Sequence, residues 1–174
     1  TTTIILLIVN AFINVNGQVT KNCRPQEGEY WTGSVYKTLF GIKWKTDNEI
    51  WVGKYLTDKY RGWAAFDISD IPDDATIIDV KVKFYVNRAS SSTDHDRVIK
   101  KMSISPAVNN ASAIWDHIEN SEWYVYDGSA GDATGYKTID LGNDARDELQ
   151  SRINVYNYFT IAFWEWDDDV DRCE

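Results

Sequence analysis

The chain has 174 residues, a formal net charge of −9 and a pI near 4.7. Nucleic acids are bound through clustered Lys and Arg, so this acidic balance argues against a nucleic-acid partner. The length suits one domain with a proper core, and the 14% share of aromatic residues favours strands.

The first feature in chain order is an apolar run at the N-terminus. It is too short to cross a bilayer as a helix, which takes about 20 apolar residues, so we expect no membrane span. The run is typical either of a signal peptide cleaved near Gly17 or of a strand buried on both faces, and we favour the strand. The side chains expected to be buried in this strand are Ile4, Ile5, Leu6, Leu7, Ile8, Val9, Phe12 and Ile13.

The N-terminal segment comprises residues 1–17. Residues 18–33 are polar and turn-rich, which predicts a linker. Residues 34–174 are expected to form one domain. Short apolar and aromatic runs separated by turn signals predict strands of a sandwich or barrel. The expected strands are 35–44, 49–55, 62–68, 77–86, 98–104, 123–126, 136–139 and 158–166.

Two segments depart from the strand pattern. Ser112 is expected to cap a short helix that ends at Ile118. Asn143 is expected to cap a second helix that ends near Ile153. In the second segment an apolar residue recurs every four positions from Leu141, which gives one apolar stripe.

The stretch from Arg61 to Val86 carries an Arg, an aromatic-rich strand, Phe66-Asp-Ile-Ser, Ile71-Pro72, a polar turn and a long alternating strand. With Ile-Trp-Val-Gly at 50–53 and the segments 113–115, 136–143 and 145–149, it resembles DNRLRE-type β-sandwich domains over about residues 34–166. The resemblance implies an all-β, jelly-roll-like β-sandwich with two short helices, carried by secreted bacterial or archaeal proteins. Some relatives are carbohydrate-binding modules.

One departure from that family concerns the C-terminal end. Members usually finish with a further apolar strand after the region that matches residues 167–174, whereas this sequence stops at Glu174. A sandwich without that strand exposes a groove and unpaired backbone groups. The N-terminal run of a neighbouring subunit could fill the groove by strand addition, and such head-to-tail contacts propagate into a filament. The alternatives are that the run folds back within its own chain, or that the sequence is truncated.

The two cysteines, Cys23 and Cys173, lie near opposite ends of the chain. In an oxidising compartment we expect them to form a disulfide, either within a chain or between neighbouring subunits. The alternative is two unpaired thiols.

Acidic residues near the C-terminus suggest a possible Ca²⁺ site, because Ca²⁺ prefers six to eight oxygen ligands from flexible acidic loops. The candidate ligands are Asp167, Asp168, Asp169 and Asp171. A solvated acidic run is the alternative, and no other cofactor is expected.

Trp164 and Trp166 share one face of their predicted strand and could stack against a glycan. Packing against the helices explains their spacing equally well. Asn110-Ala-Ser112 fits an N-glycosylation acceptor.

We expect no enzyme, because His95 and His117 are the only histidines and neither belongs to a nucleophile or metalloprotease motif. The favoured hypothesis is a structural subunit of an extracellular filament or surface assembly, a homopolymer joined by N-terminal strand donation. The alternative is a carbohydrate-binding module of a larger secreted protein, with a polysaccharide as partner. Both place the chain outside the cell or at the cell surface, and the first is favoured because it explains both ends of the chain.

Overall fold

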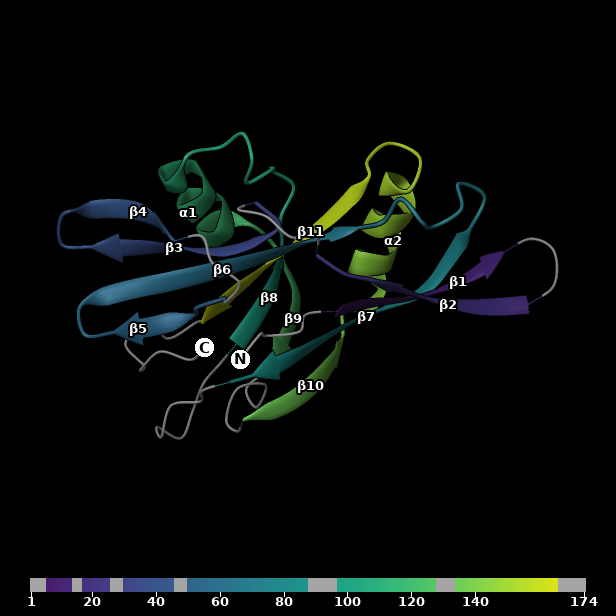
Figure 1. The fold of residues 1–174 in the computed structure, drawn as a ribbon, viewed down its shortest axis with the longest axis horizontal. Helices are drawn as coiled ribbons and strands as arrows, with labels where there is room; N and C mark the ends of the chain where they lie inside the picture. Colours follow the sequence, from purple (N-terminus) through teal and green to yellow (C-terminus); the bar gives the residue numbers. More distant parts are fainter. Residues whose placement is uncertain are drawn as a thin grey trace.

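The computed structural model describes residues 6–13, 17–25, 30–45, 50–87, 97–127 and 134–165. The elements appear in Figure 1. In chain order they are β1 (Leu6–Ile13), β2 (Gly17–Cys23), β3 (Thr32–Thr38), β4 (Gly41–Lys45), β5 (Gly53–Tyr55), β6 (Asp58–Asp67), β7 (Thr76–Val86), β8 (Arg97–Lys101), α1 (Ala111–Asn120), β9 (Trp123–Asp127), β10 (Gly135–Asp140), α2 (Gly142–Arg152) and β11 (Tyr158–Glu165).

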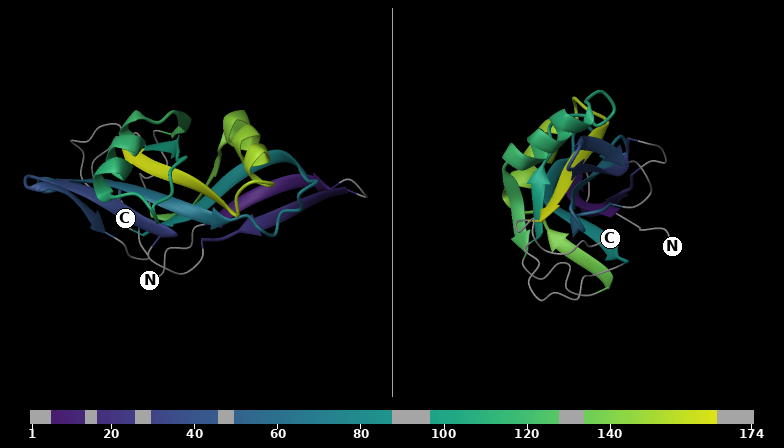
Figure 2. Two further views of the ribbon diagram at one scale, coloured as in Figure 1. Left: turned by 90° about the horizontal axis from the view of Figure 1, so that it is seen from above. Right: turned by 90° about the vertical axis from the view of Figure 1, so that its left-hand side faces the viewer.

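Over these residues the strands form two antiparallel sheets, which confirms the predicted all-β, sandwich-like class with two short helices. One is four-stranded, in the order β10-β7-β1-β2, and the other is seven-stranded, in the order β4-β3-β6-β11-β8-β9 with β5 paired to β6. The hairpins β1–β2 and β3–β4 lie at opposite ends of the molecule (Figures 1 and 2). Neither helix in the described part of the chain is long and apolar enough to cross a membrane.

The larger sheet is covered on both faces. Successive side chains of a strand point to opposite sides of a sheet, so each face can be followed along β11. On β11, Phe159, Ile161 and Phe163 belong to the main core, which also contains residues of β7, β10 and α2. Ala162, between them in sequence, belongs to a second apolar cluster that contains buried residues of α1. Strands β6 and β11 therefore carry nearly continuous buried runs, where a one-sided strand would alternate.

The N-terminal run forms a strand, as expected, and this strand pairs within its own chain. β1 lies between β7 and β2, with Leu7 opposite Val82 on one side and opposite Cys23 on the other. The fold-back alternative is therefore the arrangement seen in the single chain. Part of the expected linker is strand β2, and Ile4 and Ile5 lie outside the described residues.

Both predicted helix caps were wrong by two positions. Asn110 caps α1, since its Oδ1 accepts a hydrogen bond from the backbone N–H of Ala113 at 2.9 Å. Leu141 is the N-cap of α2 and provides no side-chain bond. There the Asp140 carboxylate accepts from the N–H of Gly142 at 2.8 Å, in a turn that needs glycine because its φ is +75°.

Candidate functional site

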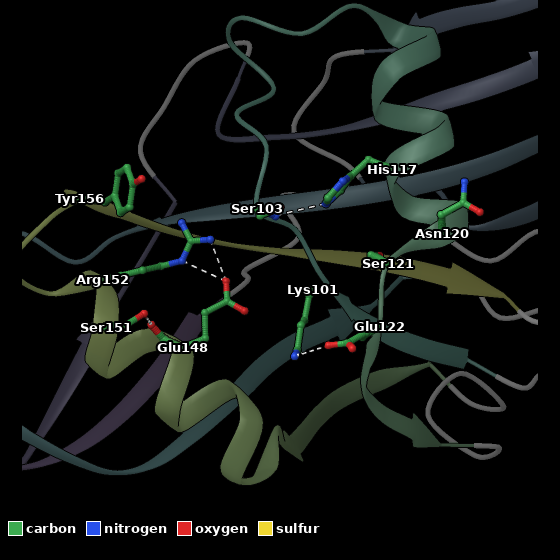
Figure 3. Close-up of a pocket in the computed structure, with 10 residues that line it drawn as sticks. All are labelled: Lys101, Ser103, His117, Asn120, Ser121, Glu122, Glu148, Ser151, Arg152 and Tyr156. Carbon is green, nitrogen blue, oxygen red and sulfur yellow. Dashed lines mark hydrogen bonds and ion pairs between the residues drawn. The ribbon is translucent and has the colours of Figure 1, made fainter.

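A pocket of about 440 Å³, lined by residues of polar type, lies between the C-terminal end of α1 and the second half of α2 (Figure 3). Four parts of the chain form it: the end of β8, the end of α1, the turn into β9, and α2 with the segment after it. Its lining residues are Lys101, Ser103, His117, Asn120, Ser121, Glu122, Glu148, Ser151, Arg152 and Tyr156.

The α1 wall holds a neutral imidazole. Nε2 of His117 accepts a hydrogen bond from the backbone N–H of Ser103 at 3.2 Å, which fixes the ring against the chain leaving β8. Burial, and then the positive charge of Lys100, lower the pKa of His117 below its usual value. The ring is therefore uncharged at neutral pH.

The α2 wall is built around one carboxylate. Glu148 and Arg152 are four residues apart on the helix, and Nε and Nη2 of Arg152 donate to Oε1 of Glu148 at 3.0 and 2.7 Å. The hydroxyl of Tyr124 donates to the other oxygen, Oε2, at 2.6 Å. Burial, together with this hydrogen bond, raises the pKa of Tyr124, so the phenol keeps its proton. The carboxylate is therefore held from both sides, and Figure 3 shows its two bonds from Arg152.

A second ion pair closes the pocket on the β9 side. Nζ of Lys101 donates to Oε2 of Glu122 at 2.6 Å. This hydrogen bond lowers the pKa of Glu122 and raises that of Lys101, so both groups stay charged at neutral pH. With this pair and the Glu148–Arg152 pair, two cations face two anions in the pocket, and its charges balance.

An exposed aromatic ring stands at the edge of this pocket. Tyr156 is 47% exposed, its ring centroid lies 5.8 Å from that of Tyr158, and the guanidinium of Arg152 lies 5.3 Å from the ring. Its position is fixed by the chain leaving α2, where its N–H donates to the carbonyl of Arg152 at 2.9 Å. Balanced charges, amide and hydroxyl groups and one aromatic face suit an uncharged ligand rich in hydroxyl groups.

The structure favours the packing explanation for Trp164. Its ring is half-buried beside the α1 cluster, with Nζ of Lys100 at 4.2 Å and the Arg61 guanidinium at 5.3 Å from its centroid. Asn110 is exposed, and its glycosylation stays a prediction. Trp166 lies outside the described residues.

The expected Ca²⁺ ligands Asp167, Asp168, Asp169 and Asp171 also lie outside the described residues, so Ca²⁺ binding stays a prediction. Within the part that the structure describes, no three His, Cys, Asp or Glu side chains come together as a metal site would require.

Cys23 is a free, buried thiol. Burial, with the nearby carboxylates of Asp67 and Asp70, raises its pKa to about 11. A thiol that keeps its proton at neutral pH is a poor nucleophile. Cys173 lies outside the described residues, so pairing of the two stays a prediction.

Sequence reasoning missed this pocket. The spacing of Glu148 and Arg152 was the one local signal, since side chains four apart on a helix face one another. The other lining residues come from separate elements, and only the folded chain brings them together.

No family model, no curated protein and no solved structure matches the chain. The resemblance to DNRLRE-type domains therefore stays a prediction.

Proposed function

We propose that the chain is a non-catalytic carbohydrate-binding module of a secreted protein and that the pocket between α1 and α2 binds a neutral glycan. The pocket's composition carries this proposal: two ion pairs whose charges cancel, the side-chain amide of Asn120, serine hydroxyls, and the exposed ring of Tyr156. Sugars present hydroxyl groups at their edges and C–H groups on their faces. Polar side chains can bind the first, and an aromatic face can receive the second.

The engaged carboxylates of the pocket support a non-catalytic role. A glycosidase keeps one carboxylic acid protonated through a raised pKa and uses a second carboxylate as base or nucleophile. Here the pKa of Glu122 is lowered by Lys101, and Glu148 accepts hydrogen bonds from Arg152 and Tyr124.

Replacing Tyr156 with alanine should weaken glycan binding about ten-fold, equivalent to about 1.4 kcal/mol, because the sugar loses its stacking face. Affinity electrophoresis in gels that contain neutral polysaccharides would find the ligand, and calorimetry with its oligosaccharides would measure the loss. Tyr136→Ala is the matched control, since Tyr136 is also exposed and pairs with Tyr85 on the four-stranded sheet, outside the pocket. Equal loss in both variants, or no binding to any neutral glycan, would contradict the proposal.

Assembly by strand donation is the second candidate, and the position of β1 favours it. β1 is the first strand in the described part of the chain and is paired on both edges, by β7 and by β2. Withdrawing β1 would leave one edge of β7 unpaired and β2, the edge strand, without its ladder partner in the described sheet. The β1 of a neighbouring chain could take the same place on β7 with the same register, and repetition would build a homopolymer.

Disulfide trapping separates donation from fold-back. Ile8 of β1 is the register partner of Lys81 of β7, and such cross-strand pairs lie within disulfide reach. We expect a mixture of Ile8→Cys chains and Lys81→Cys chains, both lacking Cys23 and Cys173, to form linked dimers on oxidation if strands are donated. A double variant that links only within each chain, together with a mixture that stays monomeric on denaturing gels, would rule donation out.

A further inference from the structure

Two hairpin turns lie side by side at one end of the larger sheet. Leu39 and Phe40 form the turn between β3 and β4, and Leu56 and Thr57 form the turn between β5 and β6. β3 and β6 are neighbouring strands, with Lys37 directly opposite Lys59. The ends of both strands are therefore level, and both turns project from the same end of the sheet (Figures 1 and 2).

The three apolar side chains of these turns are among the most exposed in the described chain. Phe40 is 92% exposed, Leu39 80% and Leu56 76%. The first turn is held in shape by Thr38, whose Oγ1 accepts from the N–H of Phe40 at 3.0 Å and donates to the carbonyl of Gly41 at 3.2 Å. Leu56 has a φ of +56°, a backbone conformation that a bulky residue rarely adopts. These side chains contribute little to the core, which points to a role at the surface.

Basic residues stand directly behind the apolar tips. Four lysines lie within three residues of the tips, Lys37, Lys43, Lys54 and Lys59, beside one carboxylate, Asp58, in a chain whose net charge is −9. Lys37 also faces α1, where its Nζ lies 5.8 Å from the ring centroid of Trp115 and its charge acts on Glu119. Lys37 and Lys43 are exposed on the β3–β4 hairpin. The two hairpin tips are therefore positive, in contrast to the net negative charge of the chain.

The spacing of tip and lysines fits a lipid interface. Each residue of a strand advances about 3.3 Å, so Lys37 lies about 7 Å behind Leu39 along β3. Apolar groups of interfacial proteins reach about 5–10 Å into the boundary between headgroups and acyl chains. Leu39 and Phe40 inserted to this depth would place the lysines at the level of the lipid phosphates.

From this geometry we infer that the two hairpin tips dock the protein onto an anionic lipid bilayer. Leu39, Phe40 and Leu56 enter the interface, and the lysines behind them contact the headgroups. A protein partner fits less well, because a stable protein–protein contact buries about 800 Å² on each side with matching shapes. Two narrow convex turns offer little such area, whereas lipid accepts protruding side chains without a preformed surface.

Vesicle co-sedimentation with the full chain tests this inference. We expect binding to vesicles of phosphatidylcholine mixed with phosphatidylglycerol, and much weaker binding to phosphatidylcholine alone. The double substitution Leu39→Ser/Phe40→Ser should lower the partition coefficient at least about ten-fold, since it removes the inserted apolar surface. Lys43→Glu should lower it about five-fold or more.

Val155→Ser is the matched control, because Val155 is 65% exposed and lies in the turn before β11, at the opposite end of β6. It should bind vesicles like the unsubstituted chain. Circular dichroism should show all variants folded, since the substituted side chains are outside the core. The inference is overturned if the folded chain does not sediment with anionic vesicles. It is also overturned if the double variant sediments as well as the original, since the contact is then ionic alone, as an acidic polymer or protein would make.

Discussion

Replacing Arg61 with alanine should lower the free energy of unfolding by about 3–5 kcal/mol, because it empties a buried site and removes the hydrogen bonds of the guanidinium. Arg61 is only 1% exposed, and its guanidinium lies 3.7 Å from the ring centroid of Trp115. Nη1 donates to the carbonyl of Trp115 at 3.0 Å, and Nη2 donates to Glu119 at 3.3 Å. In the variant the carbonyl of Trp115 loses this bond from the side chain, and the half-exposed Glu119 side chain can turn toward water.

Chemical denaturation would measure this loss, with Arg61→Met as the comparison. Methionine refills most of the space beside Trp115 and removes the positive charge next to Lys100, so it should cost less than alanine. Such buried charges often contribute little net stability relative to an apolar side chain of similar volume. An alanine variant within about 1 kcal/mol of the original would show that Arg61 does not hold α1 on the sheet.

The sequence was most informative where one strand has one buried face. The alternation of valines from Val80 to Val86 correctly predicted β7, because period two places one set of side chains in the core. It was less informative at residues 35–44, expected as one strand, where Leu39 and Phe40 form a turn between two. Apolar residues at a turn give no turn signal, and Gly41, with a φ of +127°, was the one local indication.

Contacts between distant segments could not be read from residue types. Nothing local specifies that β1 pairs with β7, because the register of separated strands depends on the whole sheet. Trp164 shows the same limit. Its spacing fitted an exposed binding strip or a packed ring, and only the positions of Arg61 and Lys100 favour packing. The pocket depends on where α1 and α2 end relative to one another, which no short pattern encodes.

Raising the pH from 8 to 10.5 should remove a destabilising contribution of Lys100 to folding. Lys100 is 1% exposed, and its Nζ donates to the carbonyl of Glu119 at 2.8 Å. Burial, and then the positive charge of Arg61, lower its pKa from 10.5 to about 8, although Glu119 acts in the opposite direction. The unfolded chain holds this proton up to the higher value and the folded chain only up to the lower one. Below pH 8 the group therefore weakens folding, by about 3 kcal/mol for a shift of this size.

Lys100→Met isolates this effect, because methionine does not titrate. Between pH 7 and 10.5 the stability of the original chain relative to the variant should rise by about 3 kcal/mol. Cys23 and Tyr124 also titrate in alkali, with raised pKa values that lower stability as the pH rises. Both groups are present in both proteins, so their contributions cancel in the difference. Urea denaturation of the two proteins across this pH range would measure the difference between their free energies of unfolding. A difference that stays constant with pH would show that Lys100 titrates in the folded chain as it does in water.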